Sequence, residues 1–262
     1  NVICATVWCL SEEAACEALD PRARMPPELR RGLLRKITHD MRQRGTRQCH
    51  LGLVDRLIGV LPSLPANQRQ GCAYCLAMLC EELSLQHRLR ILHALLFSPY
   101  VAVRRRGYKS VRANWDPSYC PLIESAWKGY GDPEAAMIIA ERFEVQYLVQ
   151  EFEALIAGLP RPWQLPRLFL RLAVHDSKAL LQLAEIDEIS FAYVRAKMGW
   201  SLSEAEAIEM LERNITDPRV GLLIWAFGRM RLLGVLHHLV EHANEYERRH
   251  MEACLDRIPP SS

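Results

Sequence analysis

The chain has 262 residues, half of them hydrophobic, and a formal net charge of +2. This length and composition are sufficient for a sizeable buried core. No apolar run reaches the roughly 18 residues that a membrane-spanning helix needs, so we expect no membrane span. The nine cysteines are an odd number and most stand in apolar stretches. We therefore expect reduced thiols and a cytoplasmic protein.

Apolar residues recur at helical spacing along almost the whole chain, and strand-like alternation is scarce. In the first half the pattern predicts helices at residues 11–19, 27–41, 50–61, 67–83, 85–97, 99–114 and 117–129. In the second half it predicts helices at residues 133–143, 145–157, 162–174, 177–186, 188–198, 202–214, 218–230, 232–243 and 246–258. Connections of about 2 to 6 residues make successive helices run antiparallel.

A helix-start signal recurs at intervals of 34, 44 and 41 residues. Each signal places a side-chain acceptor where the first free N–H groups of a helix need one, and three of the four add a proline whose missing N–H costs nothing there. The four signals are Ser98-Pro99, Asp132-Pro133, Asp176-Ser177 and Asp217-Pro218. Repeat periods of 20–50 residues are typical of stacked helix pairs. The sequence therefore predicts an all-α fold, a right-handed α-α superhelix.

Two further helix starts follow from local chemistry. Asp116-Pro117 combines a capping side chain with a proline, as in the recurring signal. Ser201 is followed three residues later by Glu204, which is the spacing of a capping box.

Two of the recurring signals open stretches that resemble HEAT repeats. In that family an Asp-Pro turn joins the helices of a pair, and a Val-Arg pair follows. Residues 98–111 match best, with Val103-Arg104 as the pair and Ser98 in place of the aspartate. Residues 217–230 are similar, with Leu223 where the arginine is expected. The resemblance implies a solenoid of antiparallel helix pairs.

We expect a single α-solenoid domain over residues 1–262. Residues 1–97 form its helical and weakly repeat-like N-terminal part, and residues 98–245 hold the HEAT-like repeats. Residues 246–262 are expected to form a capping helix and a tail.

The net charge hides a strong asymmetry. Residues 1–130 contain 19 Lys or Arg and 11 Asp or Glu, whereas residues 131–262 contain 14 and 20. The basic half has two concentrated segments. One is the run Arg30, Arg31, Arg35, Lys36, Arg42, Arg44 and Arg47; the other is the helix predicted at residues 99–114. Such asymmetry points to an acidic partner for the basic half.

The helix predicted at 99–114 has a packed face and a basic face. At 100° per residue its packed face holds Tyr100, Val103, Gly107 and Val111. Its opposite side carries Arg105, Arg106, Lys109 and Arg112. The HEAT resemblance implies that this helix lines a concave surface, which makes the four residues a candidate basic groove. The alternative is a solvated face whose arginines pair with acids on a neighbouring helix.

Aromatic residues beside the basic face suggest contacts with nucleobases. Trp115 follows the helix, and Trp127 and Tyr130 come one helix later. The chain resembles HEAT-like alkylpurine DNA glycosylases in combining basic residues, tryptophans and an aspartate, Asp116. The further aspartate expected after the tryptophan motif in that family is absent. The alternative makes Trp115 a packing residue and Asp116 a helix cap.

Two spacings are compatible with metal binding. Cys72 and Cys75 form a C-x-x-C pair to which Cys49 and His50 could add ligands. His238-Leu239-Val240-Glu241-His242 has the H-x-x-E-H pattern of inverted zinc proteases. The alternative interpretation of both is an ordinary helix face, with buried thiols in the first case. We expect neither a metal nor a cofactor.

No motif of nucleophilic catalysis or phosphate binding is present in the sequence. We therefore expect a non-enzymatic scaffold that binds a protein partner on its concave face. Nucleic-acid binding, with glycosylase-like activity as its enzymatic extreme, is the alternative. The candidate binding residues for either partner are Arg105, Arg106, Lys109, Arg112 and Trp115.

Overall fold

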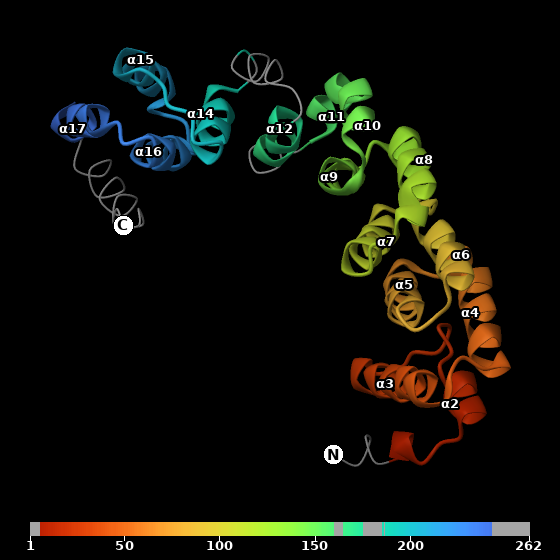
Figure 1. Cartoon of the computed structure of the whole chain (residues 1–262). Coiled ribbons are helices and arrows are strands. Elements are labelled where there is room, and N and C mark those ends of the chain that lie inside the picture. Colours follow the sequence, from red (N-terminus) through yellow and green to blue (C-terminus); the bar gives the residue numbers. More distant parts are fainter. Residues whose placement is uncertain (1–5, 160–164, 175–184, 186, 243–262) are drawn as a thin grey trace. The chain divides into compact units, whose positions relative to one another are not determined.

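The computed structural model describes residues 6–159, 165–174, 185 and 187–242. Every regular element in these ranges is helical, and helices pack mainly against their neighbours in the chain (Figure 1). The predicted all-α class is therefore confirmed. The helix expected at 246–258 and, apart from Glu185, the one expected at 177–186 lie outside the described residues. None of the described helices is both long and apolar enough to cross a membrane.

The chain divides into two compact units, Asn1–Ile139 and Ala140–Ser262. Unit 1 arranges its helices in two layers (Figure 1). One layer, here the basic layer, contains α3 (Pro27–Arg44), α5 (Ala66–Cys80) and α7 (Val101–Ala113). The other layer contains α2 (Glu12–Ala18), α4 (Gln48–Val60), α6 (Leu85–Leu96) and α8 (Cys120–Tyr130). The 3-10 helices η1 (Leu61–Ser63) and η2 (Pro117–Tyr119) complete the unit, and α9 (Pro133–Arg142) spans its boundary.

Leucine, isoleucine and valine side chains fill the space between these two layers. Leu57, Leu76 and Leu95 are fully buried and come from α4, α5 and α6. Burial of this apolar surface is the main favourable term for the unit, at about 25 cal/mol per Å².

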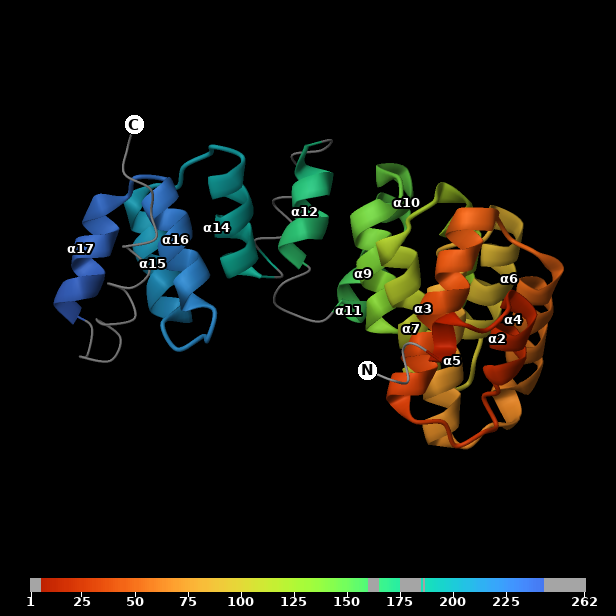
Figure 2. The same ribbon diagram turned by 90° about the horizontal axis from the view of Figure 1, so that it is seen from below.

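Unit 2 is helical throughout its described residues. It contains α10 (Val145–Gln150), α11 (Phe152–Gly158), α12 (Leu165–Ala173), α14 (Glu188–Lys197), α15 (Glu204–Asn214), α16 (Val220–Arg229) and α17 (Leu233–His242). In Figure 2, α12, α14, α16 and α17 run side by side, and each is in contact with the next. Phe169 and Phe227 are fully buried within this unit.

The prediction of one continuous helix at residues 145–157 is wrong, because the structure divides this segment at Glu151 into α10 and α11. The break allows Phe152 to pack edge-on against Phe169, with ring centroids 5.3 Å apart. An aromatic pair in this geometry is a favourable contact.

The predicted capping box is also displaced. Ser203 and Glu206, rather than Ser201 and Glu204, exchange the two capping hydrogen bonds: the Ser203 N–H donates to Glu206 Oε2 at 2.9 Å. The same spacing occurs at both places in the sequence. Starting the helix after Ser203 buries Leu202 before the cap and Ala207 in the first turn, which is the arrangement of a hydrophobic staple.

Two of the recurring signals form turns just before a helix. Ser98 Oγ accepts a hydrogen bond from the Tyr100 N–H at 3.3 Å, and Asp217 Oδ1 accepts one from the Arg219 N–H at 2.8 Å. The helices then begin at Val101 and Val220. Tyr100 therefore precedes the helix and is exposed, which corrects its predicted place on the packed face. The other three residues of that face are buried as predicted.

A buried ion pair connects α7 to the start of α9. Arg104 donates two hydrogen bonds to Asp132, with Nη2 to Oδ1 at 2.9 Å, and a third to the Ser98 carbonyl oxygen at 3.0 Å. Tyr108 donates its hydroxyl proton to Asp132 at 2.9 Å, and the ring of Tyr130 lies 4.0 Å from the Arg104 guanidinium. Burial alone would raise the pKa of Asp132, but these hydrogen bonds and the charge of Arg104 lower it below its usual value.

Unit 2 contains a comparable pair at the start of α16. Arg219 donates to Asp187 at 2.7 Å and to Asp217 at 2.9 Å. Asp187 also caps α14 through the Ser190 N–H and hydroxyl. Asp132 and Asp217, two of the recurring aspartates, thus both bind arginine side chains, and of these two only Asp217 accepts a backbone N–H through its side chain before its helix.

We predict that Asp132→Asn destabilises the protein by about 3 kcal/mol, because removing one partner of a buried pair leaves the Arg104 charge uncompensated. Urea unfolding followed by circular dichroism measures this loss. The matched control is Glu134→Gln, since Glu134 pairs with Arg105 on the surface, where an ion pair contributes about 1 kcal/mol or less. Equal losses in the two variants would contradict the structural role of Asp132.

A second prediction concerns the crossing of α6 and α7 at Gly107. A Cβ at this position would lie 2.8 Å from Leu96 Cδ2 and 3.1 Å from Leu95 Cβ. Gly107→Ala should therefore destabilise the protein by about 1–3 kcal/mol, despite the better helix propensity of alanine. Gly59→Ala in α4 is the control, because its added methyl group meets no atom within 4 Å, and thermal unfolding should show a small gain there.

Candidate functional site

The two layers of unit 1 differ strongly in charge. The basic layer of α3, α5 and α7 contains twelve Lys or Arg and two Asp or Glu, and α5 and α7 contain no acidic residue. The layer of α2, α4, α6 and α8 contains four Lys or Arg and five Asp or Glu. The positive charge of the N-terminal half is therefore concentrated on one layer of helices.

The four candidate basic residues of α7 are all exposed, as the sequence predicts. Arg105 donates to Glu134 Oε1 at 2.8 Å, so the alternative of pairing with a neighbouring acid holds for this residue. The Arg106 guanidinium lies over the ring of Tyr74 on α5, 5.4 Å from its centroid. Lys109, one turn further along α7, forms no ion pair with any residue that the structure describes.

A second helix of the layer contributes to the same surface. The guanidinium of Arg30 on α3 occupies the space beside Gly71, where a side chain on α5 would collide with it. Gly71 and Tyr74 are three residues apart on α5 and therefore share a face. Arg30 and Arg106 thus lie against the same face of α5. We call the three residues Arg30, Arg106 and Lys109 the cationic row.

Most other cations of α3 are already neutralised. Ion pairs join Arg31 to Glu28, Lys36 to Asp40, Arg42 to Glu82, and Arg44 to Glu12. Arg47, which precedes α4, also pairs with Glu12. Most cations of the basic run that begins at Arg30 in the sequence therefore form ion pairs within the protein and are not available to a partner.

Trp115 and Asp116 have local structural roles. The Trp115 ring packs edge-on against Tyr119, with centroids 6.4 Å apart, and is only partly exposed. Asp116 Oδ1 accepts a hydrogen bond from the Ser118 N–H at 2.8 Å and caps η2. Hydrogen bonds from Ser118 lower the pKa of Asp116. These contacts are the ones expected of a packing tryptophan and a capping aspartate.

Two other aromatic rings near α7, those of Tyr100 and Tyr130, each have an arginine over one face. The Arg69 guanidinium lies 3.3 Å from the ring centroid of Tyr100, and that of Arg104 covers Tyr130. Trp127, the remaining aromatic residue that the sequence offers for base stacking, is buried. Ring faces that a guanidinium already covers are not available to stack on nucleobases.

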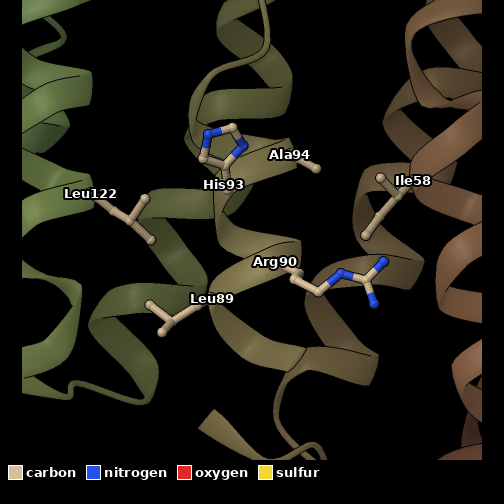
Figure 3. Close-up of a pocket in the computed structure, with 6 residues that line it drawn as sticks. All are labelled: Ile58, Leu89, Arg90, His93, Ala94 and Leu122. Atoms are coloured by element: carbon tan, nitrogen blue, oxygen red, sulfur yellow. The ribbon is translucent and has the colours of Figure 1, made fainter. Parts of the chain in front are cut away.

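An apolar groove of about 530 Å³ lies across the other layer of unit 1 (Figure 3). Leu122 of α8 and Ile58 of α4 point toward it from either side, and α6 supplies Leu89, Arg90, His93 and Ala94. Arg90 pairs with Asp55 at 2.7 Å, and His93 stacks on Phe97. None of the cationic row lines this groove, so the two surfaces are separate.

The C-x-x-C pair is buried, as the helix-face interpretation predicts. Burial raises the pKa of the Cys72 and Cys75 thiols to about 12. Cys72 Sγ donates to the Leu57 carbonyl oxygen at 3.4 Å. All cysteines among the described residues are free thiols.

A different group of metal-ligating side chains comes together in unit 1. Cys16, Cys49 and His50 place one ligand atom each within 4.8 Å of the others. The sequence suggested Cys49 and His50 as partners of Cys72 and Cys75, and no signal pointed to Cys16. The second metal motif is not tested, because the side chains of His238, Glu241 and His242 lie outside the described residues.

No family model, curated protein or solved structure matches this chain.

We predict that Cys75 and Cys72 react far more slowly with iodoacetamide than the exposed Cys9. At pH 8 a thiol of pKa about 12 is ionised about a thousandfold less than one with an ordinary pKa, and the thiolate is the reactive form. Pulse alkylation followed by peptide mass spectrometry measures each rate. The same experiment in urea should equalise the three rates, and equal rates in the folded protein would contradict the buried position.

Proposed function

We propose that unit 1 is a non-enzymatic binding module that holds an acidic segment of a protein partner against the basic layer. The observation that carries this proposal is the charge difference between the two layers, with no acidic residue in α5 or α7. Like charges gathered on one face raise the local concentration of an oppositely charged partner and steer its approach.

The cationic row supplies the contacts in this proposal. Arg106 and Lys109 are exposed, and neither forms an ion pair with a residue that the structure describes. A carboxylate on the partner can therefore bind them without first breaking a salt bridge. An arginine held over an aromatic ring, as Arg106 is over Tyr74, also loses less conformational freedom when it binds, because its position is already restricted.

The chemistry of the aromatic residues favours a protein partner over single-stranded nucleic acid. Sequence-tolerant binding of single strands depends on open ring faces that stack on bases, and Tyr74, Tyr100 and Tyr130 each have a guanidinium over one ring face. The phosphate backbone of a duplex remains the alternative ligand, because exposed cations bind it without reading its sequence.

The proposed fold that presents this surface is a HEAT-like solenoid, a right-handed α-α superhelix. Its support is the two-layered packing of neighbouring helices in unit 1, and the ion pair by which Arg104, of the Val-Arg pair, binds the aspartate of the next Asp-Pro signal. Solenoids present extended surfaces for partners rather than enclosed catalytic pockets.

We predict that Arg106→Glu combined with Lys109→Glu weakens binding of a glutamate-rich peptide by about 30-fold. This estimate assumes about 1 kcal/mol for each reversed surface charge. Fluorescence anisotropy with a labelled peptide measures the affinity, and a peptide with glutamine at every glutamate position provides the uncharged reference. Affinity should fall as salt is raised, because the charges are exposed to solvent.

The matched control is the double variant Arg22→Glu and Arg24→Glu. It makes the same change in net charge with exposed residues of the loop between α2 and α3. The control should bind the peptide within about threefold of the wild type at 0.1 M salt, where exposed charges are screened over about 10 Å. Equal losses in both variants would show a net-charge effect and would contradict a site on the basic layer.

A short duplex DNA of equal net charge separates the two partner classes. Duplex binding that is tighter than peptide binding, falls steeply with salt and disappears in the Arg106/Lys109 variant would favour the nucleic-acid alternative. Failure of both ligands to bind the wild-type protein would overturn the proposal.

A further inference from the structure

Four polar side chains meet between α2 and α4. Glu12 and Cys16 are four residues apart and share one face of α2, while Cys49 and His50 stand in the first turn of α4. The two helices lie side by side in Figure 1 and are in contact. Cys16, His50 and Glu12 are all buried, with His50 fully inaccessible, and Cys49 is half-buried. Residues distant in the sequence are thereby brought together in one cluster.

The cluster leaves two buried polar atoms without a hydrogen bond. These are Nε2 of His50 and Oε2 of Glu12, which lie 3.9 Å apart, and Arg47 Nε lies 3.3 Å from the same Oε2. A ring N–H on Nε2 and this carboxylate oxygen therefore face each other as donor and acceptor. Cys16 and Cys49 contribute two sulfur atoms beside the histidine, all with ligand atoms within 4.8 Å of one another.

The donor set is the one that Zn²⁺ prefers. Zinc binds cysteine sulfur at about 2.3 Å and histidine nitrogen at about 2.0 Å in a tetrahedral arrangement. Ligand atoms in such a site are therefore roughly 3.5–4 Å apart. The cluster needs to contract by only about 1 Å from its present spread to reach that geometry. Cys49 is half-buried, so its side chain has room to rotate inward.

The hydrogen bonds of His50 decide which of its ring nitrogens can bind a metal. Nδ1 accepts a hydrogen bond from the Arg47 N–H at 3.0 Å, so the lone pair is on Nδ1 and the proton is on Nε2, which faces Glu12. A metal that binds this ring therefore takes the Nδ1 lone pair and replaces the hydrogen bond from the Arg47 N–H.

Glu12 fits the role of the carboxylate that orients a metal-bound histidine. Such a carboxylate commonly accepts the second ring N–H of the ligand and keeps the ring in place. Arg44 pairs with Oε1 of Glu12 at 3.0 Å, and Arg47 pairs at 3.3 Å with Oε2, the oxygen that faces His50. A fixed carboxylate at this position stabilises the ring without itself binding the metal.

We propose that Cys16, Cys49 and His50 form a zinc site, with Glu12 as the partner that positions His50 and water as the fourth ligand. Binding exchanges two S–H protons for two zinc–sulfur bonds and releases both protons to solvent, with no change in oxidation state. This site differs from the C-x-x-C site considered from the sequence, and it departs from the expectation that the chain holds no metal.

The test is a titration of the full-length, phosphine-reduced protein with Zn²⁺ and, separately, with Co²⁺. We expect one zinc ion per chain by native mass spectrometry and about two protons released per zinc in weakly buffered solution. Cobalt should give a thiolate-to-metal charge-transfer band and the intense visible bands of a tetrahedral complex.

Four variants locate the site. Cys49→Ser and Cys16→Ser should each lose the charge-transfer intensity of one sulfur and weaken zinc binding by more than about 100-fold, whereas Glu12→Gln should weaken it by about 10- to 100-fold. Cys75→Ser, a buried thiol outside the cluster, should bind zinc as the wild type does. Circular dichroism confirms that each variant is folded, and Cys49, being half-buried, is the one least expected to disturb the core.

Several results would overturn the proposal. These are zinc affinity that survives Cys49→Ser, affinity lost equally in Cys75→Ser, cobalt spectra without a thiolate band, or no proton release on binding. A reduced protein that binds no zinc but forms a Cys16–Cys49 disulfide with hydrogen peroxide would also overturn it, because the pair would then be a redox pair. The peptide-binding experiment changes other residues, Arg106 and Lys109, so its failure can be distinguished from each of these outcomes.

Discussion

The structure of unit 1 depends on the burial of one guanidinium group. Arg104 is an interior residue on a helix whose other basic residues face solvent. A charge in this position is costly unless every donor finds an acceptor. Asp132 and the Ser98 carbonyl oxygen supply the acceptors, and the Tyr130 ring covers one face of the group. The pair therefore sets the rotation of α7 and its position against the start of α9.

That rotation decides which side chains of α7 are available for binding. With Arg104 and Tyr108 inside, the residues at Arg105, Arg106 and Lys109 must lie on the solvent side of the helix. Arg105 reaches Glu134 and Arg106 reaches the ring of Tyr74. Helix α7 thus provides both the buried arginine of the ion pair with Asp132 and the exposed basic side chains. A substitution that weakens this ion pair therefore also changes the exposed basic surface.

The helices, but not their tertiary contacts, were predictable from the sequence. Hydrophobic periodicity and proline-containing starts located nearly all described helices, because both signals are local. The cap of α15 is Ser203 and not the predicted Ser201. The serine-to-glutamate spacing is the same at both positions in the sequence, and only the burial of Leu202 in the folded protein distinguishes them. The basic face of α7 was likewise predictable from helical periodicity. Cys16 was not, since it is 33 residues from Cys49 and only the packing of α2 on α4 brings them together.

The proposed zinc site and the basic layer are coupled through structure but not through charge. Arg44 at the end of α3 binds Glu12, which positions His50, so ordering the cluster also orders one end of the basic layer. Zinc adds two positive charges and releases two thiol protons, so the net charge of the unit is unchanged. Long-range attraction of an acidic partner depends on that net charge and its distribution. Zinc therefore acts on partner binding only by holding α3 in place, and the salt dependence of that binding stays the same with or without the metal.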